Sequence, residues 1–394
     1  MINFDVQRLP HIEFGRGSIK QLVPAIASLG HSVLLVTGGH SFESSPHWQL
    51  LIDELRHHDI EWWHCRIVAE PSPDLVDDIV RQFAGNDVRV VVGIGGGSAL
   101  DAAKAIAGLL RSGQSVMNYL EGVGPELDYE GPAVPLIAVP TTAGTGSEAT
   151  RNAVLGRHGK DGFKKSFRDV QLVAERVIVD PALLVSCPPA VVAANGMDAL
   201  TQLLESCVSL RANRLMSTLA EDGLRAVRDG LVLWFDQGAQ AEEAQGLMAY
   251  AALLSGITLA HVGLGSVHGL AAPLGACSSI PHGVACGRLL AVATEINIRA
   301  MREREPDNAA LAVYVRCAEL LLQRHFRQPE HGWQALIELL HEWTRHLELP
   351  GLAHYGLTVP ALDDVVANAR GTSMKTNPIV LTDAELKELL QRCL

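Results

Sequence analysis

The sequence predicts two domains: an α/β domain with a doubly wound parallel sheet, followed by an all-α domain. In the first half, short runs rich in β-branched residues alternate with amphipathic helical patterns. In the second half strand patterns nearly vanish, and long helical patterns follow one another. A proline-rich turn between Pro181 and Pro189 separates the two regimes, so we expect domains at residues 1–183 and 184–394.

Three strands are expected at residues 32–39, 88–97 and 133–142. Each is continuously apolar, which is typical of strands buried on both faces in a parallel sheet. Between them, Leu, Ile and Val at helical spacing predict helices at residues 46–60 and 73–85. This βαβα order predicts the doubly wound sheet.

Long helical patterns dominate the second domain. They cover residues 197–210, 215–235, 241–262 and 311–326. Because they follow one another with few strand patterns between them, we expect an all-α domain.

Composition narrows the class of protein. With 394 residues, of which 48% are hydrophobic, the chain can bury a core in each domain. Its net charge of -12 argues against a basic surface that binds nucleic acid or anionic lipid. No apolar run approaches the roughly 20 residues that span a bilayer, and charged residues interrupt the N-terminus, so no signal peptide is expected. Seven cysteines without a CxxC pair indicate reduced thiols, and we expect a cytoplasmic protein.

A glycine-rich loop follows the second expected strand, in GIGGGSALDAAKAIA. Gly95, Gly96 and Gly97 lead into a helix that we expect to begin at Ser98, with Asp101 in its first turn. Missing side chains and free N–H groups at a helix N-terminus favour a phosphate. The strict GxGxxG pattern is absent, so a tight turn without a ligand is the alternative.

A second loop, PTTAGTGSEAT, follows the third expected strand and carries small hydroxyl side chains at Thr141, Thr142, Thr145 and Ser147. Such groups hydrogen-bond phosphate or ribose oxygens, although they also occur in plain turns. Two such loops at the ends of successive strands predict a nucleotide site, because ligands bind at the carboxyl ends of strands in open α/β sheets.

The first expected strand ends in TGGHSF. In dinucleotide-binding folds an acidic residue near this place holds the adenosine ribose and repels a 2′-phosphate. Gly38 and Gly39 supply no carboxylate, which leaves room for NADP. A loop that merely turns is the alternative.

Metal-ligand residue types gather in the second domain. Asp198 and Gln202 are four residues apart in a helical pattern and so share a helix face. His268 and His282 each precede a glycine. One carboxylate and two imidazoles suit Fe²⁺ or Zn²⁺, whereas a lone histidine is more often structural or exposed.

Taken together, the sequence resembles the iron-containing (group III) alcohol dehydrogenase family. The resemblance runs in order from Phe14 to the C-terminus. The motifs that carry it are GGGSALDAAKA, PTTAGTGSEAT, VIVDPALL, GMDALTQLLES, VHGLAAPLG, PHGVA and SMKTNPIVLTDAELKELL.

The resemblance implies an architecture like that of dehydroquinate synthase: an NAD(P)-binding α/β domain and a helical domain that holds a divalent metal. It implies a metal-dependent, NAD(P)-linked alcohol dehydrogenase or aldehyde reductase that moves a hydride between nicotinamide and a small alcohol or carbonyl compound, and a homodimer. By motif match, the metal ligands are Asp198, Gln202, His268 and His282, and both histidines are the catalytic candidates. The expected coenzyme-binding residues are Gly38, Gly39, Gly95, Gly96, Gly97, Ser98, Asp101, Thr141, Thr142, Thr145 and Lys164.

Three positions depart from the family pattern. Gln202 stands where the family usually has histidine, Ala272 where several members have a further histidine, and Gly38 where NAD-preferring members have aspartate. A glutamine oxygen is a weaker donor to Zn²⁺ than imidazole, but Asp198 and the two histidines suffice for a metal. With Ala272 unable to donate a proton, His282, water or the ribose hydroxyls remain as donors.

Other functions stay open. Gln202 and the two histidines could bind the substrate oxygen directly, as in a metal-independent oxo-acid reductase of the maleylacetate reductase type. A dehydroquinate-synthase-like lyase would need Lys and Arg for a polyanionic substrate, and residues 140–150 and 263–283 contain neither. A non-catalytic coenzyme-binding protein is a further alternative. Arg151 and Asn152 could reach the far end of a carboxylated or phosphorylated substrate, or Arg151 could lie on the surface.

Overall fold

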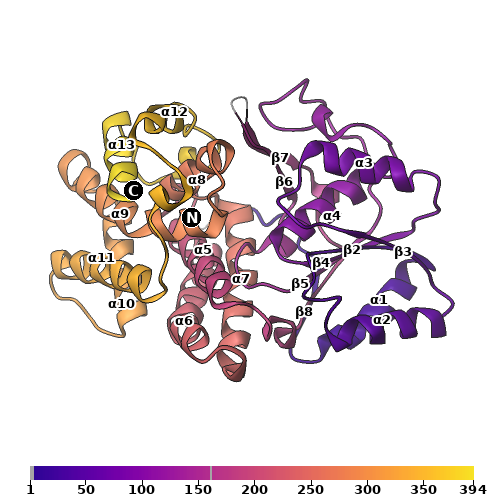
Figure 1. Ribbon diagram of the computed structural model, residues 1–394. Coiled ribbons are helices and arrows are strands. Elements are labelled where there is room, and N and C mark those ends of the chain that lie inside the picture. The colour runs from indigo at the N-terminus through magenta and orange to yellow at the C-terminus, as the bar shows by residue number, and fades with distance from the viewer. Residues whose placement is uncertain (1–3, 160–161) are drawn as a thin grey trace. The chain divides into compact units, whose positions relative to one another are not determined.

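The computed structural model describes residues 4–159 and 162–394, and the chain divides into two compact units (Figure 1). One unit consists of residues 7–157 and 164–186 and contains a parallel sheet. The other consists mainly of residues 187–394 and is helical. The expected fold class, a parallel α/β domain followed by an all-α domain, is therefore confirmed.

Six parallel strands form the sheet, in the order β1-β8-β5-β4-β2-β3. Their bounds are β1 His11–Phe14, β2 Ser32–Thr37, β3 Glu61–Arg66, β4 Val90–Gly95, β5 Leu136–Pro140 and β8 Arg176–Val179. Strand β2 pairs with β3 on one side and with β4 on the other, so the direction of winding changes between β2 and β4. In doubly wound sheets the ligand binds at the carboxyl ends of the strands at this switch point.

The three strands that the sequence predicts correspond to β2, β4 and β5, which are buried along their whole length. Strands β1, β3 and β8 of the sheet were not predicted. Strands β1 and β3 form its two edges and are only partly buried, whereas β8 is an interior strand of four residues whose apolar run is short. Strand β3 has the sequence EWWHCR, whose polar residues interrupt an apolar run. A partly solvated edge strand does not need the continuous apolar pattern of a central one.

Four helices accompany the sheet: α1 Leu22–Leu29, α2 Pro46–His57, α3 Pro73–Phe83 and α4 Gly97–Leu109. Proline occupies the first turn of both α2 and α3, where a missing N–H costs nothing. The side chain of Ser72 caps α3 by accepting a hydrogen bond from the Leu75 N–H at 3.2 Å. A separate two-stranded sheet is formed by β6 Asn152–Arg157 and β7 Phe163–Arg168.

The helical unit is arranged around α5, which contacts α6, α7 and α9. Its helices are α5 Pro189–Val208, α6 Arg214–Gln237, α7 Glu242–Val262, α8 Ser266–Cys277, α9 His282–Arg304, α10 Ala310–Leu322, α11 Pro329–His346, α12 Leu362–Ala367 and α13 Asp383–Arg392. Every residue of α5 from Gly196 to Val208 is buried. Any polar side chain on these turns of α5 therefore lies in the interior of the unit. Such a side chain needs a hydrogen-bond or ion-pair partner.

Helix α7 corrects one expectation, because by length and composition it could cross a membrane. Of its most apolar window, 67% is buried inside the structure. It packs against α5 and α6. A helix that is buried in a protein core can be as apolar as a membrane-spanning helix, so the composition of α7 is also that of a core helix.

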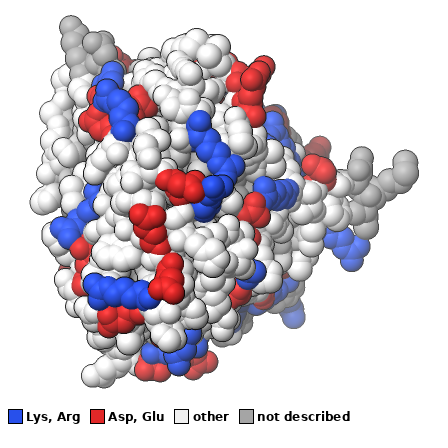
Figure 2. Space-filling model, turned by 90° about the vertical axis from the view of Figure 1, so that its right-hand side faces the viewer, with Lys and Arg blue, Asp and Glu red and all other residues white. Residues whose placement is uncertain are grey.

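Charged side chains of both signs lie close together on the surface. Figure 2 shows basic and acidic side chains interspersed over one face. Surface pairs such as Arg56 with Asp53, at 3.2 Å, have this character. Exposed pairs of this kind contribute little to stability.

Candidate active site

Three polar side chains of α5 share one helix face. Asp198, Gln202 and Glu205 follow one another at intervals of four and three residues, the spacing that aligns side chains along a helix. Their exposed fractions are 0%, 2% and 5%. A buried carboxylate is costly without partners, so each of these groups should be engaged by a neighbouring element.

His268 and His282 meet Asp198 from two other helices. His268 lies in the first turn of α8, and its Nε2 is 3.2 Å from Asp198 Oδ1. His282 is the first residue of α9, and its Nε2 is 3.8 Å from the same oxygen. The start of α9 approaches α5 closely because residue 283 is glycine: a Cβ on Gly283 would lie 2.4 Å from the carbonyl oxygen of Ala194. The structure thus brings together three of the expected ligands.

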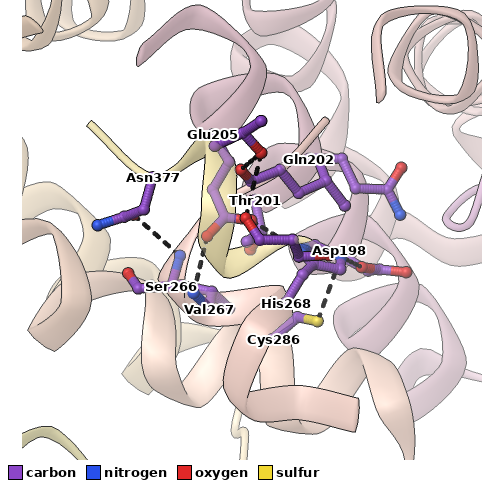
Figure 3. A network of polar contacts seen from close by, with 12 residues as sticks. Asp198, Thr201, Gln202, Glu205, Ser266, Val267, His268, Cys286 and Asn377 are labelled. Carbon is purple, nitrogen blue, oxygen red and sulfur yellow. Dashed lines mark hydrogen bonds and ion pairs between the residues drawn. The ribbon is translucent and has the colours of Figure 1, made fainter. Parts of the chain in front are cut away.

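Glu205 fixes the orientation of the His268 ring (Figure 3). Its Oε2 lies 2.7 Å from His268 Nδ1, and its Oε1 accepts a hydrogen bond from the Val267 N–H at 2.7 Å. Asn377 supports the same turn by accepting a hydrogen bond from the Ser266 N–H at 2.9 Å. Metal-binding histidines commonly donate their second ring nitrogen to such a carboxylate.

Cys286 completes the cluster and is absent from the sequence-based set. It lies one turn after His282 on α9, and its Sγ is 3.6 Å from His268 Nε2 and 3.7 Å from His282 Nε2. One ligand atom each from Asp198, His268, His282 and Cys286 all lie within 4.8 Å of one another. In the sequence HGVAC, Cys286 follows His282 by four residues, which places both on one helix face and could have indicated Cys286. Glu205 follows Asp198 by seven residues, and this helical spacing could have indicated Glu205 in the same way.

Gln202, the fourth expected ligand, is engaged elsewhere. Its Oε1 accepts a hydrogen bond at 2.6 Å from the Ser255 hydroxyl on α7. The amide oxygen, which is the only metal-binding atom of this side chain, is therefore already an acceptor.

The charges of the cluster are strongly coupled. Burial alone would raise the pKa of Asp198, but His282 and His268 lower it to about 2. Burial opposes a charge on His268, yet its interactions with Cys286, Asp198 and Glu205 raise its pKa well above the ordinary range. Burial raises the pKa of the Cys286 thiol to about 12. Metal entry must therefore release protons, as it does wherever histidine and cysteine ligands start protonated.

These residues fit a divalent metal. Asp198 Oδ2 is buried and has no hydrogen-bond partner among the residues that the structure describes. An orphaned buried carboxylate oxygen is unfavourable unless a cation meets it. Carboxylate, imidazole and thiol are all donors to Fe²⁺ and Zn²⁺.

In the sheet unit, the ends of β2, β4 and β5 come together as expected. The Gly38 N–H donates to the Ile94 carbonyl at 2.9 Å, and the Thr141 N–H donates to the Gly95 carbonyl at 2.9 Å. Gly95 has a φ of +158°, and a Cβ there would lie 2.6 Å from that of Ala99. This position therefore requires glycine.

The two glycine-rich loops also face each other. A Cβ on Gly96 would lie 3.1 Å from Thr142 Oγ1, and a Cβ on Gly97 would lie 2.7 Å from Thr145 Cγ2. Helix α4 begins at Gly97 rather than at Ser98, and the residue before it, Gly96, has an extended backbone. The expectation that Asp101 lies in the first turn of this helix is therefore wrong: it lies just beyond that turn, where a carboxylate gains less from the helix dipole.

Asp101 and the buried Lys104 instead anchor the second loop. Asp101 Oδ1 accepts a hydrogen bond from the Ser147 hydroxyl and lies 3.1 Å from Lys104 Nζ. Lys104 Nζ also donates to the Ser147 carbonyl at 2.8 Å, to Thr150 Oγ1 at 2.9 Å and to the Asn152 carbonyl. Lys104, which sequence reasoning missed, ties α4 to the loop.

Lys164 has a protein partner in the structure. Its Nζ lies 2.8 Å and 2.9 Å from the two carboxylate oxygens of Glu70. If the Lys164 ammonium also contacts the coenzyme, it does so while paired with Glu70.

Gly38 and Gly39 supply no carboxylate, as the sequence indicates, but the next acidic residue along the chain lies near the end of β2. Glu43 folds back to this end of the strand, where Thr37 Oγ1 donates to it at 2.9 Å and Arg66 Nε donates to it at 2.7 Å. The Arg66 hydrogen bond lowers the pKa of Glu43. The carboxylate near the end of β2 therefore comes from the residue directly after the turn TGGHSF. It pairs with an arginine from the end of β3. Gly39 is half-buried beside Gly38 in this turn.

Comparison with known proteins agrees with this geometry. The family described as iron-containing alcohol dehydrogenase matches residues 10–181, and the C-terminal domain of the Fe-containing alcohol dehydrogenase family matches residues 192–394. The chain belongs to the iron-containing alcohol dehydrogenase family. It is therefore an oxidoreductase that acts on CH–OH groups, in a family that implies a nicotinamide coenzyme and a divalent metal.

Relatives of the iron-containing alcohol dehydrogenase family cover most of the chain. Alcohol dehydrogenase 4 of Saccharomyces cerevisiae is 30% identical over 328 residues, 82% of this chain and 81% of the yeast protein. The NAD-dependent methanol dehydrogenase of Bacillus methanolicus is 27% identical over 401 residues and covers 100% of both chains. The crystal structure of a 1,3-propanediol oxidoreductase matches with a TM-score of 0.89 and 26% identity over 100% of both chains.

Proposed function

We propose that the protein is a metal-dependent, NAD(P)-linked alcohol dehydrogenase or aldehyde reductase that acts on a small alcohol or carbonyl compound. The observation that carries the proposal is the buried Asp198 oxygen without a partner, beside two imidazoles and a thiol. Alcohol, methanol and propanediol oxidoreductases among its relatives support the substrate class.

Asp198, His268 and His282 would hold the metal, which when bound supplies Lewis-acid polarisation of the substrate oxygen. Glu205 holds the His268 ring so that Nε2 faces Asp198. The side chains of His268 and Asp198 are 7% and 1% exposed, whereas that of His282 is 28% exposed. Solvent, and hence substrate, reaches the cluster at His282.

The proton that accompanies hydride transfer needs a donor, and Ala272 has no group that can serve. His282 has an exposed edge and lies in the cluster, so it can exchange a proton with water when it is not a metal ligand. When bound, the nicotinamide coenzyme would supply the hydride in the direction of carbonyl reduction and accept it in the direction of alcohol oxidation.

For the coenzyme, we propose the carboxyl ends of β2, β4 and β5. Gly96 and Gly97 let a phosphate approach the backbone, and the first N–H groups of α4 are left without intrahelical acceptors. Thr141, Thr142 and Thr145 offer hydroxyl donors from the facing loop. Ser98 adds a hydroxyl in the first turn of α4.

A metal-independent oxo-acid reductase is the second candidate, because the Gln202 oxygen is bound to Ser255 rather than directed only at a metal. In that case the histidines would bind the substrate oxygen directly.

We also propose a homodimer in the cytoplasm, with a small-molecule substrate and neither nucleic acid nor membrane as partner. All seven cysteines are free thiols, which supports a reducing compartment. Family membership supports the dimer, and light scattering after size exclusion would test it.

The test is NADPH and NADH oxidation with a panel of small aldehydes and oxo-acids, using protein stripped of metal and then reloaded with Fe²⁺ or Zn²⁺. Activity only after reloading supports the metal-dependent dehydrogenase. Equal activity of the stripped protein would reject the metal and favour the oxo-acid reductase. Failure with every substrate and both metals would contradict both.

A further inference from the structure

We propose that Cys286 is the fourth protein ligand of the metal, in place of Gln202, and that the resulting site of one carboxylate, two imidazoles and one thiolate prefers Zn²⁺ to Fe²⁺. The inference rests on the proposed metal-dependent function and concerns which atoms of this chain hold the ion.

Distances between the candidate ligand atoms are close to those expected around a zinc ion, to which the substrate oxygen would bind as a fifth ligand. With Zn–N and Zn–O bonds of about 2.0–2.1 Å and a Zn–S bond of about 2.3 Å, tetrahedral ligands lie about 3.3 Å apart for two N or O atoms and about 3.6 Å apart for N and S. In the structure, His268 Nε2 is 3.2 Å from Asp198 Oδ1, and Cys286 Sγ is 3.6 Å and 3.7 Å from the two imidazole Nε2 atoms. His282 Nε2 is 3.8 Å from Asp198 Oδ1, somewhat longer than the expected separation, so a bound ion would draw the His282 side chain slightly inward.

Local structure explains why Cys286 can take this place. It lies four residues after His282 on α9, so both side chains leave the same face of the helix. Its exposed fraction is 0%. Directly after it, a Cβ on Gly287 would lie 2.9 Å from Met197 Cβ, which shows how closely this turn of α9 packs on α5 beside Asp198.

Gln202 is the weaker candidate on two grounds. Ser255 Oγ already donates to its amide oxygen at 2.6 Å, which binds that oxygen to α7. An amide oxygen is also a neutral, hard donor, whereas a thiolate carries charge and is preferred by Zn²⁺. A site that lacks an imidazole on α5 thus gains a thiol from α9.

Cobalt substitution tests the assignment independently of activity, because Co²⁺ bound to a thiolate has an intense charge-transfer absorption in the near ultraviolet. The stripped protein is titrated with Co²⁺, and bound cobalt is measured by metal analysis. We expect stoichiometric binding and a thiolate band in the natural protein. The band should be lost in Cys286→Ser and retained in Gln202→Leu. The matched control is Cys277→Ser, since Cys277 is an exposed cysteine on α8.

Three outcomes separate the two proposals. A band that disappears only in Cys286→Ser supports the thiolate ligand. Stoichiometric cobalt without a thiolate band, or a band that survives Cys286→Ser, overturns this inference and leaves the metal-dependent dehydrogenase standing. No bound metal in the natural protein overturns both.

A second measurement needs no variant and so covers the case in which Cys286→Ser does not fold. X-ray absorption of the zinc-loaded natural protein should show one sulfur at about 2.3 Å together with nitrogen and oxygen at about 2.0–2.2 Å. A shell of nitrogen and oxygen alone would contradict the assignment. In competition, Zn²⁺ should displace Fe²⁺ from the natural protein, and the Cys286→Ser variant should lose much of this preference.

Discussion

His268 lies between two carboxylates, with its Nδ1 2.7 Å from Glu205 and its Nε2 3.2 Å from Asp198. Both carboxylates belong to α5, whereas the ring comes from α8. One helix therefore supplies the carboxylate of the candidate metal site and also, through Glu205, sets the direction in which the ring presents Nε2. Such a support is expected to matter for metal affinity although it does not touch the ion.

Substitution of Glu205 should weaken metal binding. In Glu205→Gln the amide can no longer fix the ring as a carboxylate does, and we expect a loss of metal affinity of about 10- to 100-fold. The loss is measured by competition with a chelator. Glu243→Gln, at an exposed position of α7, is the control. Unchanged affinity in Glu205→Gln would show that the ring is held by Asp198 alone.

Loss of the Lys104 ammonium should destabilise the sheet unit. Lys104→Met leaves the Ser147 and Asn152 carbonyls without their buried donor and Asp101 without its cation. We expect a decrease in the free energy of unfolding of about 3 kcal/mol and a higher KM for the coenzyme. Denaturant unfolding and steady-state kinetics measure the two effects. The exposed Lys20→Met should change neither, and an equal loss there would disprove the role of the buried contacts.

Stability should depend on pH through Glu148, whose buried carboxyl has a pKa raised by burial to about 7. Below the ordinary value of 4.5 both the folded and the unfolded chain bind the proton. Between there and about pH 7 only the folded chain keeps it, so the unfolded chain is favoured as pH rises. The natural protein should thus lose up to about 3 kcal/mol relative to Glu148→Gln over this interval. Guanidinium unfolding of both proteins at about pH 5 and pH 8 measures it, and parallel pH dependence would contradict the raised pKa.

A methyl group at residue 97 should impair coenzyme binding. In Gly97→Ala the new Cβ would meet Thr145 at 2.7 Å and push the two loops apart. We expect at least about tenfold weaker binding of NADPH and NADH, or 1.4 kcal/mol, in a fluorescence titration. Gly85→Ala is the control, because nothing lies within 4 Å of its Cβ. Normal affinity in Gly97→Ala would place the coenzyme phosphates elsewhere.

Coenzyme preference should shift when Glu43 is neutralised. Glu43 accepts a hydrogen bond from Arg66 at 2.7 Å and so offsets its charge at the end of β2. In Glu43→Gln the guanidinium is free to bind a 2′-phosphate, and we expect the ratio of NADPH to NADH affinity to rise by about tenfold. Glu61→Gln, exposed at the start of β3, serves as control. An unchanged ratio would mean that Arg66 does not face the coenzyme, and a fall would contradict the argument from charge.

Local patterns predicted the parts of the fold in which the residues themselves dictate the conformation. Strand β4, the glycines after it and helix α4 are continuous in sequence, and their apolar run, missing side chains and helical spacing are visible without any distant contact. The edge strands β1 and β3 were missed because their pattern depends on which side of the sheet is solvated. Glu43 was missed because its return to Thr37 is a property of the folded turn.

Local patterns were enough to predict the two-domain α/β and helical architecture, the glycine-rich loops, and Asp198, His268 and His282 as metal ligands. The packing of the helices was needed to see that Cys286 joins these three residues, that Ser255 binds Gln202, and that Glu205 orients His268. Spacing within α5 or α9 can place two side chains on one helix face, but each of these contacts joins two helices: α9 with α8, α7 with α5, and α5 with α8. Which buried donor faces which acceptor is set by how α5, α7, α8 and α9 pack, and no local pattern encodes that packing.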